Sequence, residues 1–512
     1  MPRRANEYLL AVFTVALFLA GCSGGTDTDP GTVTFLIESM PLNLDPRIGN
    51  DAPSERIGSL LFSSLVERDE HLNLRSDVAD RWETPDPLTY VFHLRRDVRF
   101  HDGRPLTSAD VKFTFDSILT GAVSTVKRIS IRLVRAVEAP DAYTVVFRLS
   151  EPYASFLWDI ARPALAIVPA NADANFAAHP VGSGPFRFVS ARQDEEVVIE
   201  RNPDYFRTPP TVERVRFRVV PEAIVRALEL RKGTADIEVS SLTPDMVAVM
   251  REDPAVAVAE RPGTNYAYVA INFNDPVLAH REVRQALAYA TDRESIVRHL
   301  FHGQARLAEG PLPPDSWAYQ PDVRNYAYDP ARAEQLLDTA GFPRRLELSG
   351  MRVRLELKTS TEEIARLLGA VLQEQWRRVG VDLQLRSLEM ATFLADIGRG
   401  SFQLYTLRWI GANNDPAIFE LVFSSRNMPP AGRNRGHYRN ARLDALLDQA
   451  RVEPDRERRR RLFAEVQEIV AADLPYLNLW FLNNLSVHRR RIGNVILEPT
   501  GGYDFLTAIT VR

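Results

Sequence analysis

The sequence predicts an α/β protein folded into at least two lobes, and three observations support this. The chain has 512 residues, 45% of them hydrophobic, whereas a single hydrophobic core rarely grows beyond about 250 to 300 residues. Short strand-like segments alternate with amphipathic helix-like segments, which is the order typical of α/β proteins. No stretch of distinct composition separates the lobes as a linker would, so we expect the chain to cross between them more than once.

Five segments have the composition of buried strands, with alternating or continuous apolar residues and a high β-branched content. In chain order they are residues 32–37, 89–94, 144–149, 196–200 and 215–219. We expect each of them to pair into a sheet with at least one covered face.

The helices are predicted from apolar residues that recur at the spacing of one helix face. One such stripe covers residues 283–290, and a longer one over residues 364–379 stops at Gly380. Glycine often ends a helix because it accepts a left-handed backbone, and residues 381–385 then alternate as a strand does. Three further helices are predicted at residues 331–340, 443–450 and 456–472, and the arginine-rich run 456–461 is interpreted as a solvated face.

The first 31 residues are interpreted as an export signal followed by a tether. A short basic stretch precedes an apolar run that is shorter than the roughly 20 residues needed to cross a bilayer. The segment Leu19-Ala20-Gly21-Cys22 then resembles the lipobox of bacterial lipoproteins, which implies cleavage before Cys22 and attachment of lipid to it. Residues 1–21 are thus expected to be a signal peptide and residues 22–31 a flexible tether. The alternative is an ordinary free or buried cysteine.

Composition and motif spacing argue against several functions. The chain has 67 acidic and 63 basic side chains, without the basic excess of a nucleic-acid-binding protein. Its nine histidines include no HExxH pair and its single cysteine cannot form a thiolate cluster, so we expect neither a metal site nor a cofactor. The segment His101-Asp102-Gly103 is interpreted as a turn. Since no nucleophile with an activating base is found, we do not expect an enzyme.

Several short blocks occur in a fixed order over more than 400 residues. They include Leu44-Asp45-Pro46, Phe100-His101-Asp102-Gly103, Val181-Gly182-Ser183-Gly184-Pro185-Phe186, Arg201-Asn202-Pro203-Asp204-Tyr205-Phe206, Ala288-Tyr289-Ala290-Thr291-Asp292-Arg293 and Tyr328-Asp329-Pro330. With these blocks the sequence resembles the bacterial extracellular solute-binding proteins of family 5, the peptide- and nickel-binding class that serves ABC importers.

The resemblance implies a two-lobed α/β fold of the periplasmic-binding-protein type, with a ligand cleft between lobes that are joined by a hinge. It also implies how the chain is divided. Residues 32–269 and 485–512 are expected to form lobe I, which carries a subdomain at about residues 59–167. Residues 270–484 are expected to form lobe II.

The resemblance further implies where a ligand binds. In peptide-binding members, a tryptophan is followed three residues later by an aspartate that binds the amine of the ligand. Trp409 matches this tryptophan, but Ala412 stands at the aspartate position, and alanine cannot offset a buried positive charge. We therefore expect no tight binding of simple free-amine peptides. Arg408, Asn413 and Asn414 offer charged and amide groups near this position instead.

The remaining candidate site residues each have a structural alternative. Asp415 is interpreted either as a helix N-cap, with Pro416 as the first helical residue, or as a cap that also faces the ligand. Trp409 is either an apolar wall of the site or a core residue. By position in the resemblance, Asn50 and Ala52 are expected to line the opposite lobe. Tyr266, Tyr268 and Trp480 are expected near the hinge or the cleft.

These observations lead to one expected function and two alternatives. The chain is expected to be a lipid-anchored, monomeric binding protein of the cell envelope, periplasmic or extracytoplasmic, that captures a peptide-like or other small solute. It would deliver this solute to an ABC permease with its ATPase. The first alternative is a non-transporting sensor or scaffold of the same fold, and the second, less favoured, is a hydrolase. Whether the anchoring membrane is the inner or the outer one stays open.

Overall fold

The computed structural model describes residues 31–69, 71–161, 165–411, 415–430 and 432–512. The predicted signal peptide, Cys22 and nearly all of the predicted tether therefore lie outside the described residues. The same holds for Ala412, Asn413 and Asn414.

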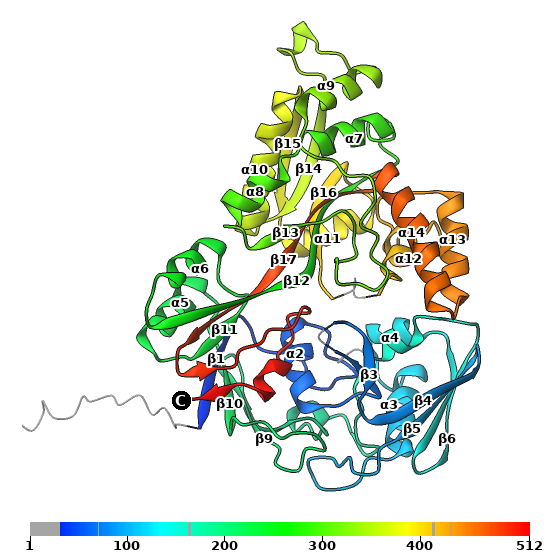
Figure 1. The fold of residues 1–512 in the computed structure, drawn as a ribbon, viewed down its shortest axis with the longest axis vertical. Coiled ribbons are helices and arrows are strands. Elements are labelled where there is room, and N and C mark those ends of the chain that lie inside the picture. Colours follow the sequence, from blue (N-terminus) through cyan, green and yellow to red (C-terminus); the bar gives the residue numbers. More distant parts are fainter. Residues whose placement is uncertain (1–30, 70, 162–164, 412–414, 431) are drawn as a thin grey trace, which may run out of the picture.

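One mixed sheet of eleven strands runs through an upper and a lower lobe (Figure 1). Its strands follow the order β15-β14-β16-β12-β17-β11-β1-β10-β9-β8, and β13 pairs with β17. Their bounds are β15 (Val381–Leu388), β14 (Val353–Ser360), β16 (Leu404–Trp409), β12 (Val256–Ile271), β17 (Tyr476–Arg489), β11 (Ile237–Val239), β1 (Thr32–Ile37), β10 (Arg214–Val219), β9 (Glu196–Arg201), β8 (Phe186–Arg192) and β13 (Ala305–Leu307). The upper lobe contains β13 to β16, and the lower lobe contains β1 and β9 to β11, with β8 beside β9.

The long antiparallel pair β12 and β17 belongs to both lobes. The register of this pair shifts between Arg261 and Asn265, and such irregularities bend a strand locally. Two backbone carbonyls near the C-terminus accept hydrogen bonds from this irregular part of β12. Arg261 Nη1 donates to the carbonyl of Leu497 at 2.8 Å and Thr264 N to that of Pro499 at 3.0 Å. The chain therefore crosses between the lobes along two paired strands.

Each lobe has its own buried apolar clusters. In the upper lobe the clusters draw on residues 266–482, and in the lower lobe they draw on residues 33–259 and 485–511. Because β12 and β17 continue through both lobes, no gap in the chain marks a boundary. The division at residues 269/270 and 484/485 stays a prediction.

A four-stranded antiparallel sheet with helix α3 forms a separate part of the lower lobe (Figure 1). Phenylalanines 92, 115, 147 and 156 meet in its core. The strands lie in the order β4 (Ala79–Asp86), β5 (Thr89–Leu94), β7 (Thr144–Leu149), β6 (Val134–Asp141), and the helical segments are α3 (Ser108–Leu119), η1 (Val126–Ile131) and α4 (Phe156–Ile160). Two further pairs of strands are β2 (Val66–Arg68) with β3 (Leu74–Ser76), and β18 (Ile492–Gly493) with β19 (Thr510–Val511).

The remaining helices cover the faces of the sheet, and many begin at a side chain that caps the first turn. Asp51, Asp292, Asp329, Asn440 and Asp455 do so. The helices are α2 (Ala52–Leu61), α5 (Ala223–Lys232), α6 (Pro244–Arg251), α7 (Arg281–Tyr289), α8 (Arg293–Leu300), α9 (Pro330–Thr339), α10 (Glu363–Arg378), α11 (Met390–Gly398), α12 (Ile418–Phe423), α13 (Ala441–Val452) and α14 (Arg456–Asp473). Within the described part of the chain, no helix is long and apolar enough to cross a membrane.

Most predicted elements are confirmed, with one exception among their side chains. All six predicted strands are present, including β15 over the predicted residues 381–385, and the predicted helices are α7, α9, α10, α13 and α14 within about two residues at each end. The helix before Gly380 ends where expected, and that glycine has φ 89°. The interpretation of residues 456–461 as a solvated face is wrong for Arg459, which is only 4% exposed. This side chain lies at the contact between α14 and the lower lobe.

Candidate ligand-binding site

Five of the predicted site residues lie on three neighbouring strands, β12, β16 and β17. Tyr266 pairs with Trp409 and Ala267 with Arg408 in the antiparallel register of β12 and β16, while Ala267 also pairs with Trp480 of β17. Because side chains alternate between the two faces of a sheet, Arg408 and Trp409 point in opposite directions. The predicted residues therefore divide between an aromatic face and a pocket face.

The aromatic face brings Tyr266, Tyr268 and Trp409 together. The ring of Tyr268 stacks on Trp409 with centroids 6.4 Å apart, and the rings of Tyr266 and Tyr268 stack at 5.5 Å. The ring of Tyr476 stacks on that of Tyr268 on the same face, with centroids 4.1 Å apart. Burial raises the pKa of all three phenols well above its ordinary value, so these hydroxyls stay neutral at any physiological pH.

Polar atoms on this face are unevenly satisfied. The hydroxyl of Tyr266 donates to Asn478 Oδ1. By contrast, the hydroxyls of Tyr268 and Tyr476 and the indole nitrogen of Trp409 are buried and make no hydrogen bond of normal geometry among the described residues. The Tyr268 hydroxyl faces that of Tyr405, and the Tyr476 hydroxyl faces Trp409. Nearly all buried polar atoms in folded proteins are paired, and exceptions often mark places that bind water or a ligand.

The opposite face contains a mainly apolar pocket of about 170 Å³ at the edge of the sheet where β14 and β16 end. Arg408 lies at its rim and pairs with Glu362 Oε2 at 3.1 Å. Trp480 forms a wall and packs on Phe301, with ring centroids 4.8 Å apart. The pocket is lined by Ala267, Phe301, Ser360, Glu362, Ile364, Ala365, Leu368, Met390, Thr406, Leu407, Arg408, Ile410, Trp480 and Leu482. Ligands of α/β proteins commonly bind at the carboxyl ends of strands.

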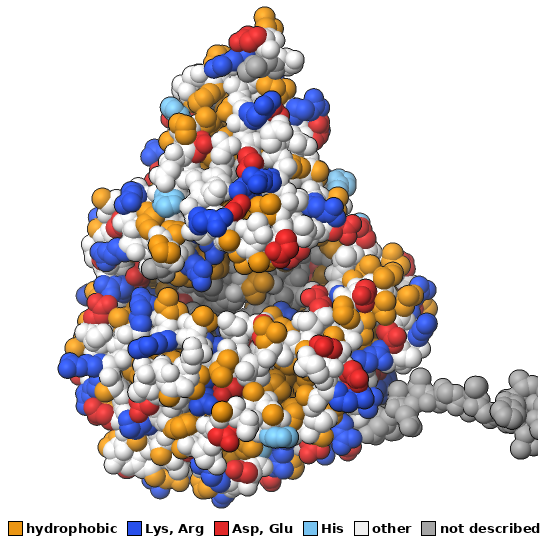
Figure 2. Space-filling model, turned by 180° about the vertical axis from the view of Figure 1, so that it is seen from behind, with side chains coloured by type: hydrophobic (Ala, Val, Ile, Leu, Met, Phe, Trp, Pro, Cys, Tyr) orange, Lys and Arg blue, Asp and Glu red, His pale blue; other side chains and the backbone are white. Residues whose placement is uncertain are grey.

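The lower lobe places Asn50 and Ala52 at the start of α2, where both are exposed. Asp51 between them caps the helix, since Ser54 N donates to its Oδ1 at 3.0 Å. The surface of the molecule is hollowed between the upper and lower lobes (Figure 2).

Asp415 departs from the predicted helix cap. Helix α12 begins at Ile418 with Ala417 as its N-cap, two residues later than expected. The carboxylate of Asp415 instead accepts from Ala417 N at 2.8 Å, which closes a turn before the helix. The same oxygen, Oδ1, accepts from Ser155 Oγ in the lower lobe at 2.7 Å. Its second oxygen, Oδ2, is buried without a partner among the described residues.

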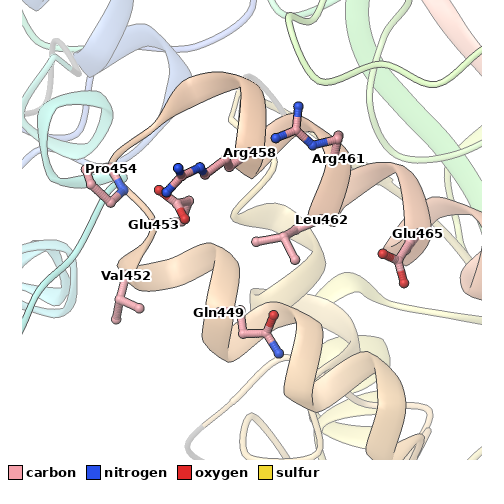
Figure 3. A pocket seen from close by; sticks show the side chains of 8 residues that line it. All are labelled: Gln449, Val452, Glu453, Pro454, Arg458, Arg461, Leu462 and Glu465. Atoms are coloured by element: carbon pink, nitrogen blue, oxygen red, sulfur yellow. The ribbon is translucent and has the colours of Figure 1, made fainter.

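Another hollow, of about 520 Å³, lies between α13 and α14 (Figure 3). Its walls carry the exposed Arg458, together with Arg461, Leu462 and Glu465. All of these side chains come from one helical hairpin, and none belongs to the predicted site. We therefore place the candidate site at the edge of the sheet rather than here.

Sequence patterns missed much of the pocket face. Phe301, Thr406 and Met390 line the pocket but were not expected there. The alternation along β16 could have indicated that Thr406 shares a face with Arg408. The contribution of Phe301 depends on the fold alone. No group of three or more His, Cys, Asp or Glu residues that could hold a metal ion occurs in the described part of the chain.

The comparison with protein families now adds to this geometry. The model for bacterial extracellular solute-binding proteins, family 5 Middle, matches residues 73–429. The chain belongs to this family. It is 26% identical over 520 residues to the dipeptide-binding protein of Escherichia coli (strain K12), a match that covers 96% of this chain and 97% of the relative. It is 27% identical over 544 residues to heme-binding protein A of Haemophilus influenzae, covering 98% of both.

The fold of this family 5 member is also that of solved structures. The structure of HbpA2 from Haemophilus parasuis superposes with a TM-score of 0.83 at 27% sequence identity, covering 94% of this chain and 100% of the other. The solute-binding proteins of the family are two-lobed, and the predicted mixed α/β, two-lobed fold is confirmed.

Proposed function

We propose that this family 5 protein is the solute-binding component of an ABC importer and that its solute has an apolar group that fills the pocket beside Trp480. The pocket at the carboxyl edge of β14 and β16 is the observation that carries this proposal. Its walls are mostly apolar, and the pair Arg408–Glu362 supplies charge only at the rim. Sites of this kind hold an apolar part of a ligand and orient its polar end with a few polar groups.

The chemical class of the solute is narrower than the family alone suggests. The two curated relatives are named for a dipeptide and for heme at nearly equal identity, so identity does not select between such solutes. Ala412 offers no carboxylate to a free amine, which disfavours simple free-amine peptides. A peptide-like molecule with a blocked amine, or another small solute with an apolar group, fits the apolar walls better.

The family and the lipobox-like residues 19–22 support the biological setting that we propose. The protein acts outside the cytoplasm, as an extracellular solute-binding protein does. Cys22 carries a lipid anchor, residues 22–31 tether the two lobes to the membrane, and the protein works as a monomer. It delivers its solute to a permease driven by a partner ATPase. Capture and release suffice for this role, so no chemistry on the solute is required.

The decisive experiment identifies the solute and tests the pocket together. Native mass spectrometry of the purified protein identifies molecules that remain bound through purification. Calorimetry then compares free-amine dipeptides with their N-acetylated forms, and we expect no submicromolar binding of the free-amine peptides. Such binding would overturn the proposed solute class. Uptake of the captured solute by cells that lack or carry the gene separates an importer component from a non-transporting sensor.

A matched pair of substitutions on α10 tests the place of binding. Ala365 lines the pocket, whereas Ala370 on the same helix is exposed and does not line it. Ala365→Phe places a ring in the pocket, and we expect at least a tenfold loss of affinity for the captured solute. Ala370→Phe is expected to leave the affinity unchanged. Equal affinity for both variants would place the solute elsewhere.

A further inference from the structure

The two lobes also touch away from β12 and β17, the paired strands that cross between them. Residues 151–159 of the lower lobe, which include most of α4, meet α13, α14 and Asp415 of the upper lobe. Figure 1 shows α4 directly below α12 and α14, on the other side of the molecule from the crossing of β12 and β17. At the edge of this contact, Ala154 N donates to the carbonyl of Arg451 at 2.8 Å, and Arg451 Nη1 pairs with Glu151 Oε1 at 2.7 Å.

The centre of the contact is a buried polar triad formed by Ser155, Asp415 and Arg459. Ser155 Oγ donates to Asp415 Oδ1 at 2.7 Å and accepts from Arg459 Nη2. Arg459 Nη2 also lies 3.5 Å from Asp415 Oδ1. Ser155 is 2% exposed, Arg459 4% and Asp415 9%. One member of the triad belongs to the lower lobe and two to the upper lobe, so opening the lobes would separate a charged pair from its bridging hydroxyl.

Aromatic rings from both lobes enclose the arginine. The Arg459 guanidinium lies 6.0 Å from the ring of Trp158 in the lower lobe and 5.5 Å from the ring of Trp317 in the upper lobe. The two rings are 6.3 Å apart. An arginine over the face of an aromatic ring is attracted to it, and more strongly where water is excluded. The arginine therefore contacts both lobes at once.

We propose that Ser155, Asp415 and Arg459 form an interlobe latch that holds the lobes closed from the side opposite the hinge. A buried hydrogen bond to a charged group contributes more than an exposed one, and both hydrogen bonds of Ser155 in the latch are lost when the lobes separate. Asp415 follows Trp409 by six residues, so the latch is joined directly to the segment that carries the aromatic face of the site. The latch rests on the proposed function only in that closure is what retains the solute.

This assignment gives Asp415 a role other than that of a ligand carboxylate. Its Oδ1 is occupied by Ser155 and Ala417, and Arg459 lies beside it. It is a positioning residue, since it acts through the relative placement of the lobes. A weaker latch lowers the fraction of closed molecules, and the apparent solute affinity falls by the same factor.

Hydrogen exchange on the full chain without added solute tests the latch. The amide of Ala154 is the reporter, because its acceptor lies in the other lobe. The amides of Leu149 and Leu474, which bond to Leu88 and Val470 within their own lobes, report on folding. Ser155→Ala removes the bridging hydroxyl, and this hydroxyl makes no capping bond to α4. We expect about tenfold or faster exchange at Ala154 in this variant, with Leu149 and Leu474 unchanged.

A neighbouring arginine supplies the control. Arg459→Gln is expected to speed exchange at Ala154, whereas Arg460→Gln is not, since Arg460 is exposed and pairs with Glu457 on its own helix. If Arg459→Gln also speeds exchange at Leu474, the substitution unfolds α14. In that case the result for Ser155→Ala alone tests the latch. Unchanged exchange at Ala154 in Ser155→Ala overturns the latch. That result would leave the solute experiments untouched, because no solute is present here.

Discussion

Replacing Tyr266 or Tyr268 by phenylalanine is expected to change the stability of the protein in opposite directions. Both side chains are 0% exposed, and their rings stack on the same face of β12. The hydroxyl of Tyr266 donates a hydrogen bond to Asn478, whereas that of Tyr268 faces Tyr405 without a hydrogen bond of normal geometry in the described part of the chain. Replacing each tyrosine by phenylalanine removes only the hydroxyl. The two variants therefore compare a paired with an unpaired buried hydroxyl.

The expected sizes follow from the cost of burying polar atoms. Tyr266→Phe loses a hydrogen bond and leaves Asn478 Oδ1 without its donor, so the free energy of unfolding should fall by about 1 to 3 kcal/mol. Tyr268→Phe removes a hydroxyl whose dehydration is compensated poorly, because it makes no hydrogen bond of normal geometry. The free energy of unfolding should therefore rise by about 1 kcal/mol. Urea unfolding of both variants and the parent protein, with no solute added, measures the two changes.

The same variants separate stability from binding. A hydroxyl kept unpaired at a cost in stability is typical of a functional site. Tyr268→Phe is thus expected to weaken binding of the captured solute while it stabilises the protein. If Tyr268→Phe destabilises the protein as much as Tyr266→Phe does, its hydroxyl is paired and the reasoning is refuted. If it stabilises the protein and leaves the solute affinity unchanged, Tyr268 is no part of the site.

Two further predictions concern glycine packing and pH. A Cβ at Gly182 would lie 1.8 Å from the carbonyl oxygen of Leu61, so Gly182→Ala is expected to give no soluble protein. At Gly58, inside α2, a Cβ would meet nothing within 4 Å, so Gly58→Ala should raise the free energy of unfolding by about 0.5 to 1 kcal/mol. Similar yields of soluble protein for the two variants would contradict the expected clash at Gly182. Burial and then the charge of Asp504 raise the pKa of Glu498 to about 8 from 4.5. The folded protein therefore holds a proton that the unfolded chain releases, and stability is lost as pH rises between these values. Melting temperatures from pH 5 to 9 should fall less steeply in Glu498→Gln than in the parent protein, and equal slopes would exclude this carboxyl as the cause.

Much of the secondary structure could be predicted, because it depends on short-range patterns. Residues 32–37 form β1 as expected, since an unbroken run of apolar and β-branched residues suits a buried strand. The sixteen-residue strand β12 was not predicted. It is stabilised by pairing with β17, which lies more than 200 residues away, and no local pattern carries that information.

The candidate site shows the same division. The resemblance named Trp409, Tyr266 and Tyr268, and the structure brings them together on one face. It also named Arg408 and Trp480, which lie on the other face, where the pocket is. Because successive side chains of a strand point to opposite faces, the sequence alone predicts that Arg408 and Trp409 point in opposite directions. Which face forms a pocket depends on α10 and Phe301, whose positions are set by packing.

By itself, the sequence determined the family resemblance, the α/β class and the order of most elements, because ordered motifs and hydrophobic periods are properties of neighbouring residues. Only the tertiary structure decided how the lobes meet. Arg459 stands within a run of similar arginines, and nothing in that run marks it as buried. It is buried because α14 turns it toward Ser155, Asp415 and two tryptophans. These residues come from three distant parts of the chain and meet only when the whole protein has folded.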